Sequence, residues 1–190
     1  MKSQNEGFDM QPELENDFVK IRPLRKDDFE ALYKVASDPL LWEQHPNKNR
    51  YKRDVFENFF KGAIESGGAF LVFDKKTDEV IGSSRYYKFD ESKKFVSVGY
   101  TFLARSCWGS EYNRALKTLM LDHAFNYADE VYFHLGENNI RSQKAILKLG
   151  AVKIGEADIE YYGEEYYKNF IYIINKEMWA EIKKNIQKSE

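Results

Sequence analysis

The sequence predicts a mixed α/β domain, with a central, mostly antiparallel twisted sheet and helices on both of its faces. Two short segments near the start carry apolar residues at helical spacing. Three consecutive segments rich in aromatic and β-branched residues follow, joined by charged turns as in a β-meander. The second half of the chain alternates apolar strands with amphipathic helices. Elements in this order pack as helices on one mixed sheet.

The length suits a single domain. A chain of 190 residues and 22.4 kDa buries roughly 70% of its unfolded surface, so one core is sufficient. We interpret the polar residues 1–16 as a flexible N-terminal arm and residues 17–190 as one domain. The net charge of −2 and the pI near 6.0 argue against nucleic acid as the main partner, because a phosphate backbone requires a basic surface.

The single cysteine, Cys107, excludes an intrachain disulfide and a thiolate metal cluster, and we expect no metal. No apolar run approaches the roughly 20 residues that span a bilayer, so no membrane partner is expected. The first 17 residues are polar and acidic and have neither signal-peptide nor transit-peptide character. The protein is therefore predicted to be cytoplasmic.

Hydrophobic spacing gives the expected elements in order, with period two in strands and apolar residues three and four apart in helices. Strands are predicted at Phe18–Leu24, Ala69–Phe73, Glu79–Phe89, Phe95–Leu103, Val131–Leu135, Ala151–Tyr161 and Tyr167–Ile174. Helices are predicted from Asp27 to Ala36, at Arg53–Glu65, from the loop after Arg105 to about Ala128, from about Ile140 to Leu149 and at the C-terminus, with a turn or short helix between Pro39 and Pro46.

Turn and cap residues support these boundaries. Asp27 and Asp28 favour a helix start, because acidic side chains interact well with the first turn. The glycine pair at 67 and 68 is typical of a helix end, and Gly150 fits a C-terminal cap. The charged stretches DKKTD and DESKK are expected to be hairpin tips.

The loop and helix start at Arg105–Phe125 are a candidate anion site. Gly109 permits a positive φ, and the free N–H groups of the next helical turn, aided by the helix dipole, can bind a diphosphate. The expected inner face of the helix consists of Leu116, Leu119, Met120, Ala124 and Tyr127. The alternative is an ordinary helix N-terminus behind a turn, because a strand, a glycine and a helix form a weak signal.

A second candidate is GENNIRSQKAILKLGA, Gly136–Ala151. Its asparagines cap a helix whose inner face is predicted to contain Ile140, Ala145, Ile146 and Leu149. Arg141 and Lys144 lie close enough to the helix start to reach an anion. The alternative is a capped amphipathic helix with a solvated basic face.

Together these stretches, VGYTFLARSCWGSEY, LMLDHAF and ENNIRSQKAILKLGA, resemble the acetyl-CoA-binding core of the GNAT superfamily of N-acetyltransferases, in particular its RimJ/RimL type. The matching motif residues are Val98–Tyr100, Trp108, Gly109, Tyr112, Asn139, Ser142 and Lys148–Gly150. The opening VKIRPLRKDDFEALYKVASDP and the closing NFIYIINKEMW extend the resemblance to residues 18–179. The resemblance implies the GNAT fold, with the sheet splayed between its fourth and fifth strands.

The resemblance implies an acyl-CoA-dependent N-acetyltransferase that moves an acetyl group from acetyl-CoA to a primary amine, on a protein N-terminus or a small molecule. It also makes a homodimer possible. The residues expected to contact acetyl-CoA are Thr101, Phe102, Leu103, Trp108, Gly109, Ser110, Glu111, Tyr112, Asn113, Asn139, Arg141, Ser142 and Lys144. Among these, the backbone N–H of Thr101, Phe102 or Leu103 is expected to polarise the thioester carbonyl, and we assign this catalytic role to Phe102.

The diphosphate loop departs from the family pattern at two positions. Glu111 stands where the family usually has Gly, and Asn113 where it has Gly or Ala. A carboxylate directed at a diphosphate costs on the order of 1 kcal/mol or more at about 4 Å. We expect the Glu111 side chain to turn outward, with Arg105, Arg114 or Lys117 offsetting its charge; the alternative is a decayed loop that binds the cofactor weakly.

The resemblance also supplies catalytic candidates. The family's frequent tyrosine donor to the leaving thiolate falls on Ile146, so Ser142 is the expected donor. The family's frequent glutamate falls on Ser97, which leaves Glu160 as the first candidate for a general base and His134 as the second.

The hairpin Asp158–Tyr167 concentrates acids and aromatic rings that can attract a cationic amine acceptor; the alternative is an exposed hairpin whose tyrosines pack across the strands. Trp42 and His45 are candidates for the opposite wall of an acceptor cleft; the alternative is that they are core and surface residues. Two other functions remain open: a catalytically weak or inactive acyl-CoA-binding module of the same fold, and an interaction protein without a cofactor.

Overall fold

A computed structural model describes residues 7–187. Its strands are β1 (Leu14–Glu15), β2 (Val19–Pro23), β3 (Ala69–Asp74), β4 (Val80–Asp90), β5 (Phe95–Leu103), β6 (Glu130–Gly136), β7 (Val152–Glu160) and β8 (Tyr166–Asn175). Its helices are η1 (Lys26–Asp28), α1 (Phe29–Ala36), η2 (Pro39–Trp42), α2 (Arg53–Glu65), η3 (Arg105–Cys107), α3 (Tyr112–Ala124), α4 (Ile140–Lys148) and α5 (Lys176–Gln187).

The strands form one mixed sheet in the order β1-β2-β3-β4-β5-β6-β8-β7. All neighbours are antiparallel except β5 and β6, which are parallel. The chain must cross over between these two strands, and α3 provides that crossover. The fold predicted from the sequence, including the type and order of its main elements, is confirmed.

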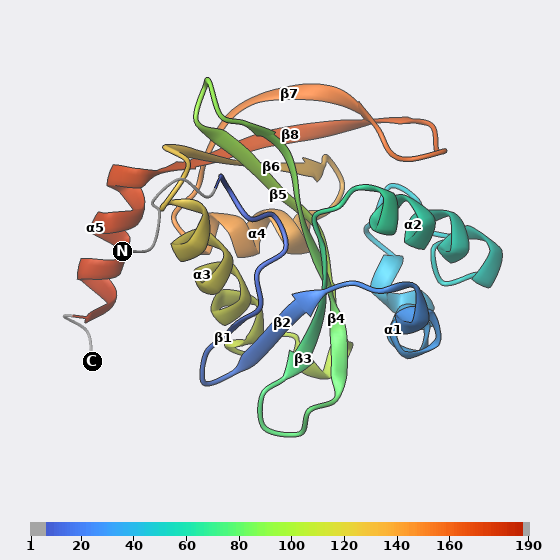
Figure 1. The fold of residues 1–190 in the computed structure, drawn as a ribbon. Coiled ribbons are helices and arrows are strands. Elements are labelled where there is room, and N and C mark those ends of the chain that lie inside the picture. Colours follow the sequence, from blue (N-terminus) through green and yellow to red (C-terminus); the bar gives the residue numbers. More distant parts are fainter. Residues whose placement is uncertain (1–6, 188–190) are drawn as a thin grey trace.

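Helices cover the two faces of the sheet with separate hydrophobic clusters (Figure 1). α3, α4 and α5 pack on one face, with Leu116, Met120 and Trp179 buried against strand residues such as Val98. α1 and α2 pack on the other, where Phe56 and its neighbours cover the opposite side of the sheet. The pleat of each strand sends alternate side chains to the two clusters.

The described part of the predicted arm is not loose. Residues 1–6 lie outside the described residues, but β1 pairs with β2 and the amide of Gln11 donates to the backbone oxygen of Ala69. The ring of Phe8 lies 5.2 Å from that of Tyr86 and 4.7 Å from that of Phe89. The prediction missed these contacts because an isolated aromatic residue in a polar segment has no local periodicity.

Two predicted helix faces need correction. α3 ends at Ala124 rather than near Ala128, which leaves Tyr127 40% exposed, and Ile140 at the start of α4 is 47% exposed. The inward positions are instead occupied by polar side chains, Lys117 in α3 and Gln143 in α4, which are 3% and 8% exposed. No helix among residues 7–187 is long and apolar enough to cross a membrane.

Candidate active site

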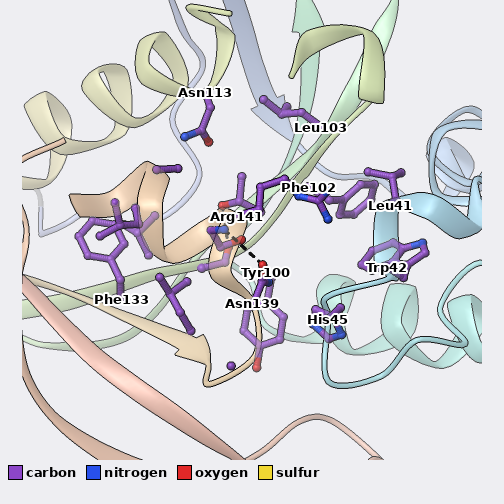
Figure 2. Close-up of a pocket in the computed structure, with 18 of the residues that line it drawn as sticks. Leu41, Trp42, His45, Tyr100, Phe102, Leu103, Asn113, Phe133, Asn139 and Arg141 are labelled. Carbon is purple, nitrogen blue, oxygen red and sulfur yellow. Dashed lines mark hydrogen bonds between the residues drawn. The ribbon is translucent and has the colours of Figure 1, made fainter. Parts of the chain in front are cut away.

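A pocket of about 230 Å³ opens where β5 and β6 part. The two strands pair only at Phe95–Ser97 and Glu130–Tyr132. Beyond these pairs, Val98–Leu103 of β5 and Phe133–Gly136 of β6 line the pocket (Figure 2). The main chain of β5 therefore borders the pocket on the side where a neighbouring strand would otherwise lie.

Tyr100 marks a bend in β5 at this point. Its φ of +53° lies in the left-handed region, and the register of β4 against β5 shifts between Ser83 and Arg85. Such a bulge reorients the strand beyond it and is unfavourable for a residue with a side chain. The bulge turns the backbone of Thr101–Leu103 along the pocket wall.

The loop before α3 closes one end of the pocket. Gly109 has a φ of +70°, and Trp108, Gly109, Ser110 and Asn113 line the cavity. Open space surrounds the position of a Cβ at Gly109, so the conformation rather than crowding requires glycine. This geometry places the first turn of a 13-residue helix at the pocket, as an anion site requires.

Glu111 and Tyr112 are outside the pocket lining. The Glu111 carboxylate lies 2.7 Å from Nε of Arg114, and both side chains are more than half exposed. The Glu111 side chain therefore points away from the cavity, with Arg114 as its counter-charge, which is the arrangement that a working diphosphate loop requires. Tyr112 donates to the Asp74 carboxylate instead of contacting the cavity. Arg105, also considered as a counter-charge, pairs with Asp38.

The start of α4 forms a second wall. The side-chain oxygen of Asn139 accepts from the backbone N–H of Ser142 at 3.2 Å and so caps the helix. The guanidinium of Arg141 lies 3.6 Å above the ring of Trp108, which links this helix start to the loop before α3. Ser142 lines the pocket, whereas Lys144 is exposed outside it, because its position on α4 faces solvent.

The opposite end of the pocket is aromatic. Trp42 and His45 line it, the first of the two alternatives left open by the sequence, and Tyr87, Tyr100 and Tyr161 complete the walls. Figure 2 shows Trp42, His45 and Tyr100 around this part of the cavity.

The predicted acidic acceptor hairpin requires correction. Of the stretch Asp158–Tyr167, only Tyr161 lines the pocket. Glu160 is exposed and accepts a hydrogen bond from Tyr166, because the alternation of β7 directs it to solvent. The structure therefore argues against Glu160 as a general base. His134, the second candidate, does line the pocket and forms a hydrogen bond with Tyr87 at 2.8 Å.

Both pocket histidines are held neutral near pH 7. Burial, followed by the charge of Lys88, lowers the pKa of His134 to about 4. Burial and the nearby guanidinium of Arg50 hold the pKa of His45 well below its usual value. In the described part of the chain, none of the residues lining the pocket is an Asp or Glu.

A buried ion pair supports the aromatic end. Nη2 of Arg50 lies 3.0 Å from Oε1 of Glu164, and the two side chains are 3% and 7% exposed. The guanidinium also lies 4.8 Å from the ring centre of Phe59 and 5.3 Å from that of Tyr161. The pair joins the segment before α2 to the β7–β8 hairpin.

The sequence analysis did not predict that two basic side chains, those of Lys117 and Arg85, are buried in the protein. Lys117 is buried in the pocket wall, where its ammonium donates to the hydroxyl of Thr101. Arg85 of β4 is 5% exposed, with its guanidinium 4.0 Å from the ring centre of Tyr100. The signal was present: Lys117 follows Asn113 by one helical turn on the same face, and Arg85 stands within a long run of strand residues.

A parted parallel strand pair, a bulged strand edge and a glycine-turned helix start at one pocket are the features of an acyl-CoA-dependent N-acetyltransferase. The acetyltransferase (GNAT) domain family matches residues 19–152, and the chain belongs to that family. Its predicted enzyme class is thereby confirmed.

Solved structures share the fold. A GCN5-related N-acetyltransferase from Brucella melitensis is 16% identical with a TM-score of 0.80, over 93% of this chain and 84% of that one. RimJ of Mycobacterium smegmatis, in complex with CoA-disulfide, is 17% identical with a TM-score of 0.66, over 88% and 87%. Spermidine N-acetyltransferase of Vibrio cholerae, in complex with CoA and spermine, is 16% identical with a TM-score of 0.65, over 87% and 99%.

Proposed function

We propose that this enzyme transfers the acetyl group of acetyl-CoA to a primary amine that carries no further positive charge, such as a peptide N-terminus or a small monoamine. The observation that carries the proposal is the pocket itself: an anion-binding helix start at one end, a bulged strand along its wall and an aromatic, carboxylate-free chamber at the other.

The residues of the pocket fit acetyl-CoA. The backbone around Gly109 and Ser110, together with the start of α3, would hold the diphosphate, and the charge of Arg141 supports it. Glu111 offers no conflict, because it faces Arg114. The N–H groups of Thr101–Leu103 would polarise the thioester carbonyl from the strand edge, with Phe102 as the central candidate. The hydroxyl of Ser142 is available to the sulfur.

The acceptor chamber supports an amine that arrives without its proton. Trp42, Tyr100 and Tyr161 provide aromatic faces, and His45 and His134 are neutral groups. The residues that line the pocket include no carboxylate to bind the second charge of a polyamine. The acids of the β7–β8 hairpin lie on its outer surface or are paired with Arg50. His134 is the proposed acceptor of the amine proton, through Nε2, in the tautomer whose Nδ1–H donates to the hydroxyl of Tyr87.

The test is acetyl-CoA-dependent thiol release with a panel that contrasts peptides of neutral N-terminal residue, monoamines and polyamines. We expect turnover with the first two classes and kcat/KM at least tenfold lower with spermidine. Preference for polyamines would refute the acceptor assignment. Binding of acetyl-CoA without thiol release for any amine would instead favour the non-catalytic acyl-CoA-binding module.

A further inference from the structure

Lys117 is the one buried lysine among the residues that the structure describes as lining the pocket. It lies between Leu116 and the core residue Met120 on α3, where an apolar side chain would be expected. Its ammonium donates to the hydroxyl oxygen of Thr101, which also lies 2.8 Å from that of Ser84. A buried cation is costly without an anion, and the residues lining the pocket provide no carboxylate.

The position of Lys117 is distinct from the anion site at the helix start. It follows Tyr112, the first residue of α3, by five positions, or about 7.5 Å along the helix axis. Its partner Thr101 adjoins the bulge at Tyr100, two residues before the end of β5. The contact with Thr101 therefore places the ammonium beside the strand edge proposed to hold the thioester.

We propose that Lys117 is the catalytic acid that protonates the sulfur of coenzyme A as it leaves. This inference rests on the proposed function. The amine nitrogen forms a bond to the acetyl carbon and gives one proton to His134, the carbon–sulfur bond breaks, and its electron pair remains on sulfur. Sulfur then takes a proton from the Lys117 ammonium, and the neutral lysine regains one from solvent after the products leave.

The acidity of Lys117 suits this step. Burial lowers its pKa to about 7, with no charged neighbour contributing, whereas an ordinary thiol has a pKa of about 8.5. An acid is most useful when its pKa lies near the working pH. The hydroxyl of Ser142 is a much weaker acid, and Ile146 cannot donate. The other ionisable groups lining the pocket are His45, Arg50, Tyr87, Tyr100, Cys107, His134, Arg141 and Tyr161.

The first test does not require turnover. The thiol of bound CoA is titrated by its thiolate absorbance in the wild type, in Lys117→Met and in Lys34→Met, a control at an exposed helix lysine outside the pocket. We expect the thiolate to form about one pH unit lower in the wild type and the control than in Lys117→Met, because the bound thiolate and the Lys117 ammonium stabilise each other, so that the thiolate also raises the pKa of Lys117 in the complex. Lys117→Gln provides a second neutral variant if Lys117→Met does not fold.

The second test uses the acetyl transfer reaction. Removal of a general acid is expected to lower kcat by about 100-fold or more, with the Kd for CoA changed less than about threefold if no ground-state contact is lost. The fall of kcat at high pH should be present in the wild type and in Ser142→Ala but absent in Lys117→Met.

The outcomes separate the two proposals. An unchanged thiol titration in Lys117→Met overturns the inference, as does a large loss of CoA affinity without a change in that titration, which would make Lys117 a phosphate ligand. Wild-type protein that binds no CoA refutes both proposals. A shifted thiol titration in a protein that acetylates no amine supports the role of Lys117 while refuting the proposed acceptor.

Discussion

Replacing Arg50 with methionine should destabilise the enzyme strongly, because it leaves a buried carboxylate without its partner. The Arg50 and Glu164 side chains are 3% and 7% exposed, and Nε and Nη2 both donate to the same oxygen, at 3.2 and 3.0 Å. The other oxygen of Glu164 is buried without a hydrogen-bond partner among the described residues. The arginine is therefore the main compensation for a charge that water does not reach.

The size of the effect follows from this burial. Removing one partner of a buried ion pair costs about 3–5 kcal/mol. At about 2.1 cal/mol/K per residue, the entropy of unfolding 190 residues is roughly 0.4 kcal/mol/K, so a loss of about 4 kcal/mol lowers Tm by about 10 °C. Differential scanning calorimetry measures both quantities, provided that unfolding is reversible.

The double variant Arg50→Met with Glu164→Met should recover most of that loss, since two apolar side chains replace the buried charges. The matched control is Arg53→Met, which breaks the pair with Glu30 whose side chains are 50% and 71% exposed, and it should cost no more than about 1 kcal/mol. If the double variant is as unstable as the single one, the loss comes from the aromatic contacts of Arg50 and the ion-pair reasoning is refuted.

Other consequences can be checked in the same way. Gly109→Val should raise the Kd for CoA about tenfold, because a β-branched residue at positive φ costs about 1–2 kcal/mol, while Gly109→Asn should change it less; isothermal titration calorimetry measures both. Glu111→Gln should change that Kd less than about twofold, since the carboxylate faces Arg114 and screening weakens exposed charges. Glu160→Gln should leave kcat and its pH profile unchanged in the thiol-release assay. The pKa of His134 is about 4 in the folded protein, against 6.5 in the unfolded chain. Between these pH values the unfolded chain binds more protons, so the free energy of unfolding falls as the pH falls from 6.5 to 4. His134→Gln should make the free energy of unfolding, measured by urea denaturation, depend less on pH in this range.

The fold was predictable because hydrophobic spacing and turn chemistry are local signals. The helix Arg53–Glu65 is observed with its predicted bounds, and the meander and the parallel crossover follow from the same patterns. The sequence was a poorer guide to whether a single polar side chain faces the pocket or solvent. Glu160 was placed toward the acceptor because acids and tyrosines cluster in its hairpin, yet strand alternation directs it to solvent.

Long-range packing explains the remaining differences. Lys117 occupies an inward position of α3 that periodicity assigned to apolar residues, because Thr101 on a distant strand offers it a hydroxyl. Phe8 is ordered because it reaches a surface formed by β4 and α3. The contact of Phe8 leaves no trace in the local sequence, and the burial of Lys117 is indicated only by its position one helical turn after Asn113. The candidate anion site at Gly109 could be predicted because its signal, a glycine before a helix, is local.

The distribution of charge reconciles a glutamate in the loop with binding of a highly anionic co-substrate. Glu111 is neutralised by Arg114 at the surface, so its field is weak inside the pocket. The charged groups that line the pocket are cationic: Arg50, Lys117 and Arg141. Arg50 is compensated by Glu164 and Arg141 pairs with Glu43, so Lys117 is the cation of the lining whose side chain contacts a hydroxyl instead of a carboxylate. A positive charge on Lys117 disfavours a protonated amine at the reaction centre. An acid in the loop is therefore compatible with the proposed binding of acetyl-CoA, because its side chain points away from the cavity.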